Sequence, residues 1–392
     1  MDFELTDDQE ELQRVVRDVA SSECPPSLVR AVAEEYAGHP GGSRAEVDAL
    51  WKTYVGLDWP SLTVPEADGG MGCSAVELVL TLEELGRVAD PTPFLATTSQ
   101  YLPIVRECGD ADQRRALLGA VCAGGTGAVA FSSSRGAPTE VRAEPDGDGW
   151  RVEGAAHVVI DGDRADEIAF VATTDSGVGV FVVPAGDVHA TRSKSFDATL
   201  HVAEVRVDGV VIGAERALVG PSVEAAVERA RLEAIAGMAA TMVGASQWIL
   251  DHVLEHVRSR HQFGVPIGSF QAVKHMLVDV YVSIERARAL CHFAALTLAE
   301  RDDRAPLGAS MAKAAAGDAQ RIAVQHGVQL FGGLGYTWEN DLQLFLRRAK
   351  AGELLLGSTT EHRRRAAEIV TKQAATKQVS PNRTSATQEG VR

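Results

Sequence analysis

The chain has 392 residues, of which 45% are hydrophobic and 23% are charged, and its formal net charge at pH 7 is −16. A chain of this length has room for two or three domains, and its composition is that of a globular protein. The large negative charge argues against a surface that binds nucleic acid or anionic membranes without specificity.

The cysteines and the N-terminus predict where the protein works. The five cysteines are widely spaced and form no C-x-x-C pair, a pattern that favours reduced, buried thiols over disulfides or a zinc site. The acidic start, residues 1–5, lacks a basic and then apolar signal. The longest uncharged run, residues 234–250, lies inside an amphipathic pattern and is slightly short for a membrane span. We therefore expect a cytoplasmic protein with no membrane and no nucleic-acid partner.

Residues 1–122 are predicted to form an N-terminal helical domain. Residues 7–21 are charged and amphipathic, and residues 75–87 carry apolar side chains at helical spacing with acids on the other face. Prolines and glycines between positions 60 and 72 mark the connecting loop.

Residues 123–220 change to the period of two that is typical of strands, so they predict a middle β-barrel or sandwich domain. Apolar, β-branched runs cover residues 168–173 and 178–184, and Asp146–Gly149 reads as a tight turn. Residues 202–212 read as a strand pair turned at Asp208-Gly209.

Residues 221–373 are predicted to form a C-terminal four-helix bundle, which makes the whole an α+β multidomain fold. Pro221-Ser222 starts a helix, Pro306 opens another, and Gly332-Gly333 closes that one. From Val273 to Ala294, apolar residues advance in steps of four and three, which keeps one seam facing a partner helix. Residues 374–392 are polar and patternless and are predicted to be a disordered tail.

Two segments of the bundle carry a specific pattern. Arg260–Gln271 reads R-H-Q-F-G-V-P-I-G-S-F-Q, and Gln329–Tyr336 reads Q-L-F-G-G-L-G-Y. The first is similar to the acyl-CoA dehydrogenase signature R-x-Q-F-G-x-P-I-x-x-F-Q, and the second resembles the Q-x-x-G-G-x-G-Y segment of that family. The resemblance covers about residues 1–372 and implies the family's fold and its FAD cofactor.

The resemblance implies that these segments hold the ADP half of FAD and reach into a neighbouring subunit's site. Their chemistry suits that role, because arginine offers a planar cation to phosphate oxygens, glutamine hydrogen-bonds with both ends of its amide, and glycines let backbone approach closely. The implied cofactor residues are Arg260, Gln262, Phe263, Gln329, Gly332 and Gly333.

The pattern departs from the family where the flavin ring would sit. The family segment L-T-E-P-x-x-G-S-D corresponds to a region beginning Phe131-Ser132, in which only Ser132 remains as a small hydrogen-bonding group. In the family segment G-x-K-x-W-I-T, the tryptophan position falls on Val158 and the threonine position on Ile160. A valine covers less of a flat ring than an indole does, and an isoleucine cannot donate a hydrogen bond.

The catalytic base is also altered. The family's usual glutamate position falls on Leu356, or on Gly357 with a shift of one residue, and neither side chain can take a proton. The other family position, on the earlier bundle helix, falls on Ala234, which leaves the adjacent Glu233 as a weak candidate, although one helical step turns a side chain by about 100°. A positioned base is worth about 10²- to 10⁴-fold in rate. Glu233 can equally be paired with an arginine.

His252-Val-Leu-Glu-His256 matches the H-x-x-E-H pattern of some zinc peptidases, but no third ligand is evident nearby and the segment leads directly into the Arg260 motif. We expect no metal site there.

Three functions compete. One is an acyl-CoA dehydrogenase that desaturates a CoA thioester between its α and β carbons, with FAD as hydride acceptor and an electron-transfer flavoprotein downstream. The second is a base-deficient, cofactor-sharing subunit of a heteromer, resembling steroid side-chain acyl-CoA dehydrogenases. The third is a non-redox acyl-thioester-binding protein or a flavin-dependent oxygenase of the same fold. The resemblance implies a homo- or hetero-tetramer with a related dehydrogenase chain, and an acyl-CoA substrate.

Overall fold

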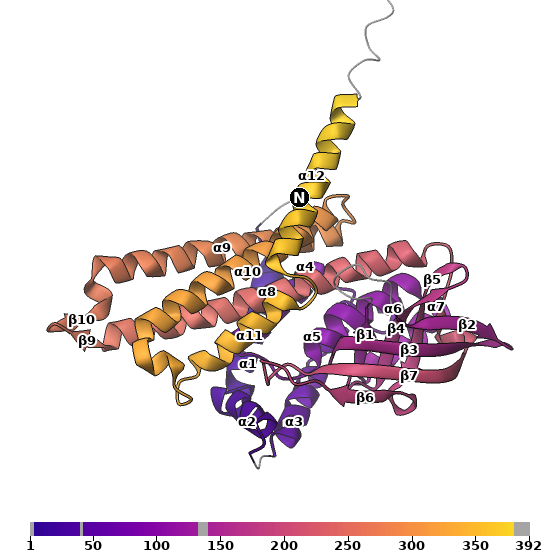
Figure 1. The fold of residues 1–392 in the computed structure, drawn as a ribbon, viewed down its shortest axis with the longest axis horizontal. Coiled ribbons are helices and arrows are strands. Elements are labelled where there is room, and N and C mark those ends of the chain that lie inside the picture. Colours follow the sequence, from indigo (N-terminus) through magenta and orange to yellow (C-terminus); the bar gives the residue numbers. More distant parts are fainter. Residues whose placement is uncertain (1–3, 40–41, 132–139, 380–392) are drawn as a thin grey trace, which may run out of the picture.

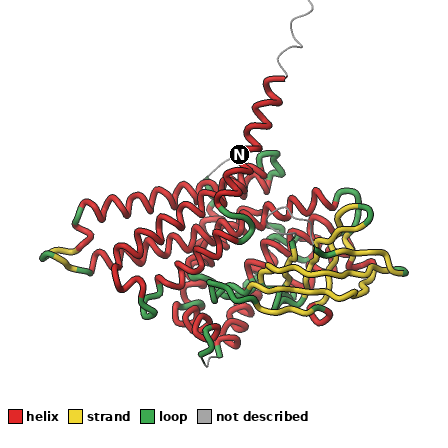
Figure 2. The backbone as a smooth tube through the Cα atoms, in the orientation of Figure 1, coloured by secondary structure: helices red, strands yellow, loops and turns green. Residues whose placement is uncertain are grey.

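The structure, a computed structural model, describes residues 4–39, 42–131 and 140–379. Long helices run alongside one another, a mixed sheet lies at one side, and the N-terminal helices lie against both (Figure 1). Strands and helices are largely segregated in space (Figure 2). The arrangement confirms the predicted α+β fold class.

The N-terminal part is helical, as predicted. Both predicted helices begin with a capping box, in which the side chain of each residue of a pair accepts a hydrogen bond from the backbone amide of the other. The pairs are Thr6 with Gln9 and Ser74 with Glu77. The helices are α1 (Asp7–Glu23), α2 (Pro26–Tyr36), α3 (Ser43–Gly56), α4 (Ala75–Arg87), α5 (Phe94–Ala96), α6 (Leu102–Cys108) and α7 (Ala111–Cys122).

The structure describes eight strands in the middle part, outside residues 132–139: β1 (Gly127–Ala130), β2 (Arg142–Asp146), β3 (Gly149–Ile160), β4 (Glu167–Thr174), β5 (Gly177–Pro184), β6 (His189–Arg192), β7 (Val202–Gly213) and β8 (Ala217–Leu218). They form one sheet in the order β6-β7-β3-β2-β4-β5-β8, with β1 parallel to β4. Because β6 and β8 stand at the two ends of this order, the described strands make an open sheet, not the barrel that the sequence allowed.

One predicted hairpin is wrong. Asp208-Gly209 does not turn a strand pair but lies within the single strand β7. Along the pairing of β3 with β7, Glu153 pairs with Asp208 and Val152 pairs with Val210, so Gly209 is the extra residue of a β-bulge, with φ +68°. The other predicted turn is confirmed, because Asp146 and Gly149 pair across a two-residue loop between β2 and β3.

The C-terminal part is a helical bundle, as predicted. Its elements are α8 (Val223–Ser259), the hairpin strands β9 (His261–Gln262) and β10 (Val265–Pro266), α9 (Gln271–Ala299), α10 (Ala305–Phe331), the 3₁₀ turn η7 (Gly332–Tyr336), α11 (Leu342–Leu354) and α12 (Thr359–Val379). The seam from Val280 to Ala294 on α9 is buried. Residues 374–379 continue α12 beyond the predicted start of the tail, and residues 380–392 lie outside the described residues.

No helix within the described part of the chain is long and apolar enough to cross a membrane. Residues 234–250 lie inside α8, where most of their side chains are buried by neighbouring elements.

Helix α8 is held very close to α4. A Cβ added at Gly86 would overlap the Thr241 carbonyl oxygen, and one added at Gly244 would overlap the Glu83 carbonyl oxygen. Glycine at both positions therefore lets the two backbones touch, which fixes the bundle against the N-terminal helices.

Arg348 on α11 ties all three parts of the chain together. Its side chain is 7% exposed, and its Nε lies 2.8 Å from an oxygen of Asp197, which is 1% exposed. It also donates to Thr199 Oγ1 at 2.7 Å and to the Ala89 and Asp90 carbonyl oxygens, both at 3.1 Å. A buried guanidinium that meets several acceptors from three regions favours one relative placement of those regions.

Candidate flavin-nucleotide site

The arginine motif and the diglycine motif of the bundle lie at the same end of it. Arg260 follows α8 directly and leads into the β9–β10 hairpin, which forms the left tip of the bundle in Figure 1. Helix α10 ends at Phe331, and the ring of Phe331 stacks on that of His256, one turn before Arg260, with 4.1 Å between ring centroids. The structure therefore brings the arginine motif and the diglycine turn together, although they are far apart in sequence.

The proposed cofactor residues of the bundle share one property, which is that all six are exposed in the single chain: Arg260, Gln262, Phe263, Gln329, Gly332 and Gly333. Phe263 is 93% exposed, and it lies at the turn of the hairpin with φ +53°. An exposed phenylalanine on a projecting hairpin is costly in water and is typical of a residue that a partner molecule covers.

The diglycine turn fits a ligand or partner that comes close to the backbone. Gly332 needs glycine because it combines φ +62° with ψ −138°, outside the left-handed helical region that other residues can adopt. Gly333 has no such need, and a Cβ added there would meet nothing within 4 Å in this chain. Packing inside the chain thus does not explain the missing side chain at Gly333, and the donor set of arginine, glutamine and free backbone suits the phosphates of an ADP moiety.

The positions that would serve the flavin ring do not fit it. Val158 is 60% exposed and lies where the pairing of β3 with β7 is irregular, between Ala156 and Val159. Ile160 is 3% exposed and packs in an apolar cluster, so it offers no hydrogen bond. Ser132, the remaining candidate on this side, lies outside the described residues. In the described part of this chain, the residues fit the nucleotide half of FAD but not its ring.

The base positions are built into a structural turn between α11 and α12. Leu356 adopts φ +57°, and it packs against an apolar cluster that includes Leu232 and Ile235. A Cβ added at Gly357 would lie 2.7 Å from Nε2 of His362, so a glutamate there would require His362 to move.

The carboxylates nearest in sequence are used as helix caps. Glu361 accepts hydrogen bonds from the backbone and hydroxyl of Ser358 at 2.8 and 2.9 Å, and Glu353 accepts from the Thr359 amide at 3.3 Å and from Lys350 at 3.0 Å. Both therefore stabilise the start of α12.

Lys313 on α10 contacts the same turn between α11 and α12. Its ammonium group is fully buried and donates hydrogen bonds to the carbonyl oxygens of Gly352 and Gly357, both at 2.8 Å. Burial lowers the pKa of Lys313 to about 7, although Glu353 and Glu361 oppose this shift. The lysine closes the end of α11 by satisfying carbonyl oxygens that have no partner within the helix.

Lys313 makes stability depend on pH. Its pKa falls from 10.5 to about 7 on folding, so between these values the unfolded chain binds more protons than the folded one. The free energy of unfolding should then rise with pH over this window by up to about 1.4 kcal/mol per pH unit. We expect Lys313→Met to remove this rise in urea titrations at pH 7.5 and 9, whereas the exposed Lys350→Met should keep it. Equal pH dependence in the parent chain and Lys313→Met would contradict this assignment.

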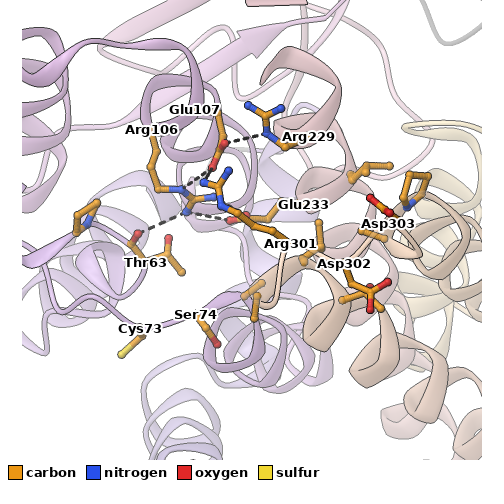
Figure 3. A pocket seen from close by; sticks show the side chains of 18 of the residues that line it. Thr63, Cys73, Ser74, Arg106, Glu107, Arg229, Glu233, Arg301, Asp302 and Asp303 are labelled. Atoms are coloured by element: carbon orange, nitrogen blue, oxygen red, sulfur yellow. Dashed lines mark hydrogen bonds and ion pairs between the residues drawn. The ribbon is translucent and has the colours of Figure 1, made fainter. Parts of the chain in front are cut away.

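Glu233 lies in a separate cavity of about 530 Å³ between α6, α8 and the turn that joins α9 to α10 (Figure 3). It is 6% exposed, and its carboxylate pairs with Arg106 at 2.6 Å. Glu107 forms ion pairs with three arginines: Arg106 at 3.5 Å, Arg229 at 3.1 Å and Arg301 at 3.0 Å. Burial would raise the pKa of the Glu107 carboxyl, but these arginines lower it below its usual value. The charges of this cavity are thus largely compensated within the chain.

The pairing with Arg106 predicts that Glu233 is not a base. If the chain takes part in the desaturation of an acyl-CoA that the resemblance implies, we expect Glu233→Gln to leave that turnover within about threefold, because the loss of a positioned base costs at least about 100-fold. Steady-state rates at saturating acyl-CoA test this. A loss of 100-fold or more, with unchanged flavin content, would restore Glu233 as the catalytic group.

Sequence reasoning missed the groups that surround the candidate residues: Lys313 beside the base positions, Arg106 beside Glu233, and the ring pair of His256 and Phe331 beside the two motifs. Lys313 did leave a signal, because it is the one charged residue in the alanine-rich run Ala312–Ala316. The partner of Glu233 left none, since Arg106 is 127 positions away.

Comparisons with known proteins agree with the fold and the motifs. The family model of the acyl-CoA dehydrogenase N-terminal domain matches residues 6–125, and that of the C-terminal domain matches residues 223–371. Acyl-CoA dehydrogenase IpdE2 of Mycolicibacterium smegmatis is 30% identical over 92% of this chain and 98% of its own length.

Two solved structures are similar over nearly their whole length. The ChsE4-ChsE5 complex from Mycobacterium tuberculosis has a TM-score of 0.83 and 27% identity, covering 95% of this chain and 99% of that chain. A variant of the steroid acyl-CoA dehydrogenase Tcur3481-Tcur3483 has a TM-score of 0.82 and 28% identity, covering 94% and 99%. With both terminal domains matched and a full-length relative at 30% identity, the chain belongs to the acyl-CoA dehydrogenase family, whose cofactor is FAD.

Proposed function

We propose that this chain is the cofactor-sharing, base-deficient subunit of a heteromeric acyl-CoA dehydrogenase. The assembly would desaturate a CoA thioester between the α and β carbons in the cytoplasm, with an electron-transfer flavoprotein as the next partner. FAD would supply the hydride acceptor. In this chain, Arg260, Gln329 and the Gly332-Gly333 backbone would bind the nucleotide phosphates of a flavin that a partner chain seats.

The observation that carries the proposal is an asymmetry between the two halves of the flavin site. The groups for the nucleotide are all present and all exposed at the bundle tip. The positions for the ring and the base that the structure describes hold Val158, Ile160, Leu356 and Gly357, none of which has a polar side chain. A chain that served only its own flavin would need both halves.

Two of the similar structures support a heteromer, since one is a complex of ChsE4 with ChsE5 and the other joins Tcur3481 with Tcur3483. In each, the similar chain is part of a pair of different chains. This likeness favours a related dehydrogenase chain as the partner of this one, in a heterotetramer.

Purifying this chain by itself, and then together with a co-expressed homologous chain, tests the proposal. We expect the chain alone to be colourless, and the co-purified complex to be yellow and to oxidise an acyl-CoA. Flavin per chain, from absorbance, and the mass of the complex, from light scattering, are the measurements. A yellow homomer of this chain alone with about one FAD per chain would overturn the proposal, and a colourless chain that binds an acyl thioester without any partner would favour a non-redox binding protein.

A further inference from the structure

Five aromatic rings form a continuous stack on one face of α8. The ring of Phe345 lies on Trp248 with 3.7 Å between centroids and 7° between planes. Trp248 lies on His252 at 4.6 Å and 20°. His252 lies on Phe331 at 5.1 Å and 20°, and Phe331 lies on His256 at 4.1 Å and 23°. Trp248, His252 and His256 are spaced by four residues, so they follow one another along a single face of the helix.

The two histidines hold Phe331 between them. Phe331 is the last residue of α10, and Gly332, at which the chain reverses, follows at once. His256 lies one turn before Arg260, whose amide donates to the His256 carbonyl oxygen at 2.8 Å. The stack therefore joins the residue directly before the diglycine turn to the helical turn that ends at the motif arginine.

Polar contacts do not make this connection. Within the described residues, no hydrogen bond or ion pair joins the segment 256–270 to the segment 329–337. Apart from the stack, the packing here is close and apolar: Val257, Val328 and Phe331 belong to one buried cluster, and a Cβ added at Gly327 would lie 3.1 Å from Ile249. Among these contacts, the ring stack is the directional one, and it lies directly beside both motifs.

Histidine suits this place better than phenylalanine for a physical reason. His252 and His256 are only partly buried, because the end of the bundle faces solvent. An imidazole can place its face on Phe331 while its nitrogens remain hydrated, whereas a phenyl ring would expose apolar edge. The H-x-x-E-H spacing, which alone reads as a metal pattern, thus has another use, since it puts one ring on each side of a third.

We propose that His252 and His256 are positioning residues. They clamp Phe331 between their rings, so that the diglycine turn and Arg260 form one preorganised binding site for the nucleotide of the flavin. This inference rests on the proposed function. Neither histidine need touch the cofactor. A site that is already formed binds more tightly because less conformational entropy is lost on binding.

The test uses the heteromer with its flavin removed, titrated with FAD and followed by flavin fluorescence. We expect His256→Ala to weaken FAD binding about tenfold, and His256→Gln, which keeps polarity and size but has no ring, to do the same. His256→Phe should restore binding to within about twofold, because it restores the stacked ring. His275→Ala, at an exposed histidine of α9, should change nothing.

The possible outcomes distinguish a failure of this inference from a failure of the proposed function. If Arg260→Ala weakens FAD binding while His256→Ala and His256→Gln bind normally, the clamp is wrong and the proposed function stands. If His256→Phe binds as weakly as His256→Ala, stacking is not the cause and the inference also fails. If Arg260→Ala itself binds FAD normally, the proposed function fails, and the clamp with it.

Discussion

Arg260→Ala in this chain is expected to lower the affinity of the heteromer for FAD by roughly 100-fold, because an arginine can donate two charge-assisted hydrogen bonds to phosphate, each worth about 1.5 kcal/mol or more. Arg260 is exposed at the bundle tip, and no ion pair joins it to a carboxylate within the described part of the chain, so its guanidinium can reach a neighbouring chain. The effect should appear as colour lost on gel filtration and as a weaker FAD titration.

Two further variants sharpen this result. Arg258→Ala removes an exposed arginine two positions earlier on α8 and should leave flavin content unchanged. Arg260→Lys keeps the charge but not the planar fork, so binding should recover only in part. If Arg260→Ala and Arg258→Ala retain flavin equally, the motif arginine does not hold the nucleotide.

Arg348→Met should lower the free energy of unfolding by about 3–5 kcal/mol, the usual cost of leaving one partner of a buried ion pair alone. Asp197 would remain buried, at 1% exposure, without its cation. The hydrogen bonds to the Ala89 and Asp90 carbonyl oxygens would also be lost. Urea or thermal unfolding of the purified chain measures this change.

Arg347→Met is the matched control, because Arg347 is the preceding residue on the same helix and has a similar size. Arg347 is partly exposed and lies over the rings of Phe196 and Trp338 at 5.3 and 5.5 Å, contacts of the kind worth about 0.5–1 kcal/mol. We expect a loss of at most about 1 kcal/mol from this variant. Equal losses from Arg347→Met and Arg348→Met would show that Arg348 does not join the three parts of the chain.

Local signals in the sequence predicted much of the fold. Helix α4 has the predicted bounds, because Ser74 and Glu77 form a capping box at its start and the apolar spacing continues to Arg87. The turn at Asp146–Gly149 formed because glycine at position 147 accepts a positive φ. Each of these depends only on residues within one turn or one helix.

The sequence was less informative where one pattern serves two structures. Asp208-Gly209 reads as a hairpin turn, but glycine with positive φ serves equally in a β-bulge, and only the pairing with β3 decides between them. Likewise, H-x-x-E-H describes two histidines one turn apart, and whether they meet a metal or a ring depends on Phe331, which arrives from another helix.

The candidate site shows the same division. The residues proposed for the nucleotide come from their motifs, and the structure adds that they lie at one end of the bundle and are exposed. The buried charges that fix the site could not be found, because their partners are remote in sequence. Arg348 meets Thr199 across 149 positions, and Lys313 meets the Gly357 carbonyl oxygen across 44.

The number of working sites in the heteromer tests the central claim most directly. Turnover is measured after the partner chain's own catalytic carboxylate is replaced by its amide, with this chain left unchanged. Because Leu356 and Gly357 cannot take a proton, we predict that turnover falls by at least about 100-fold while the flavin remains bound. If about half of the turnover remains, this chain performs the reaction at a site of its own, and its assignment as the base-deficient subunit is wrong.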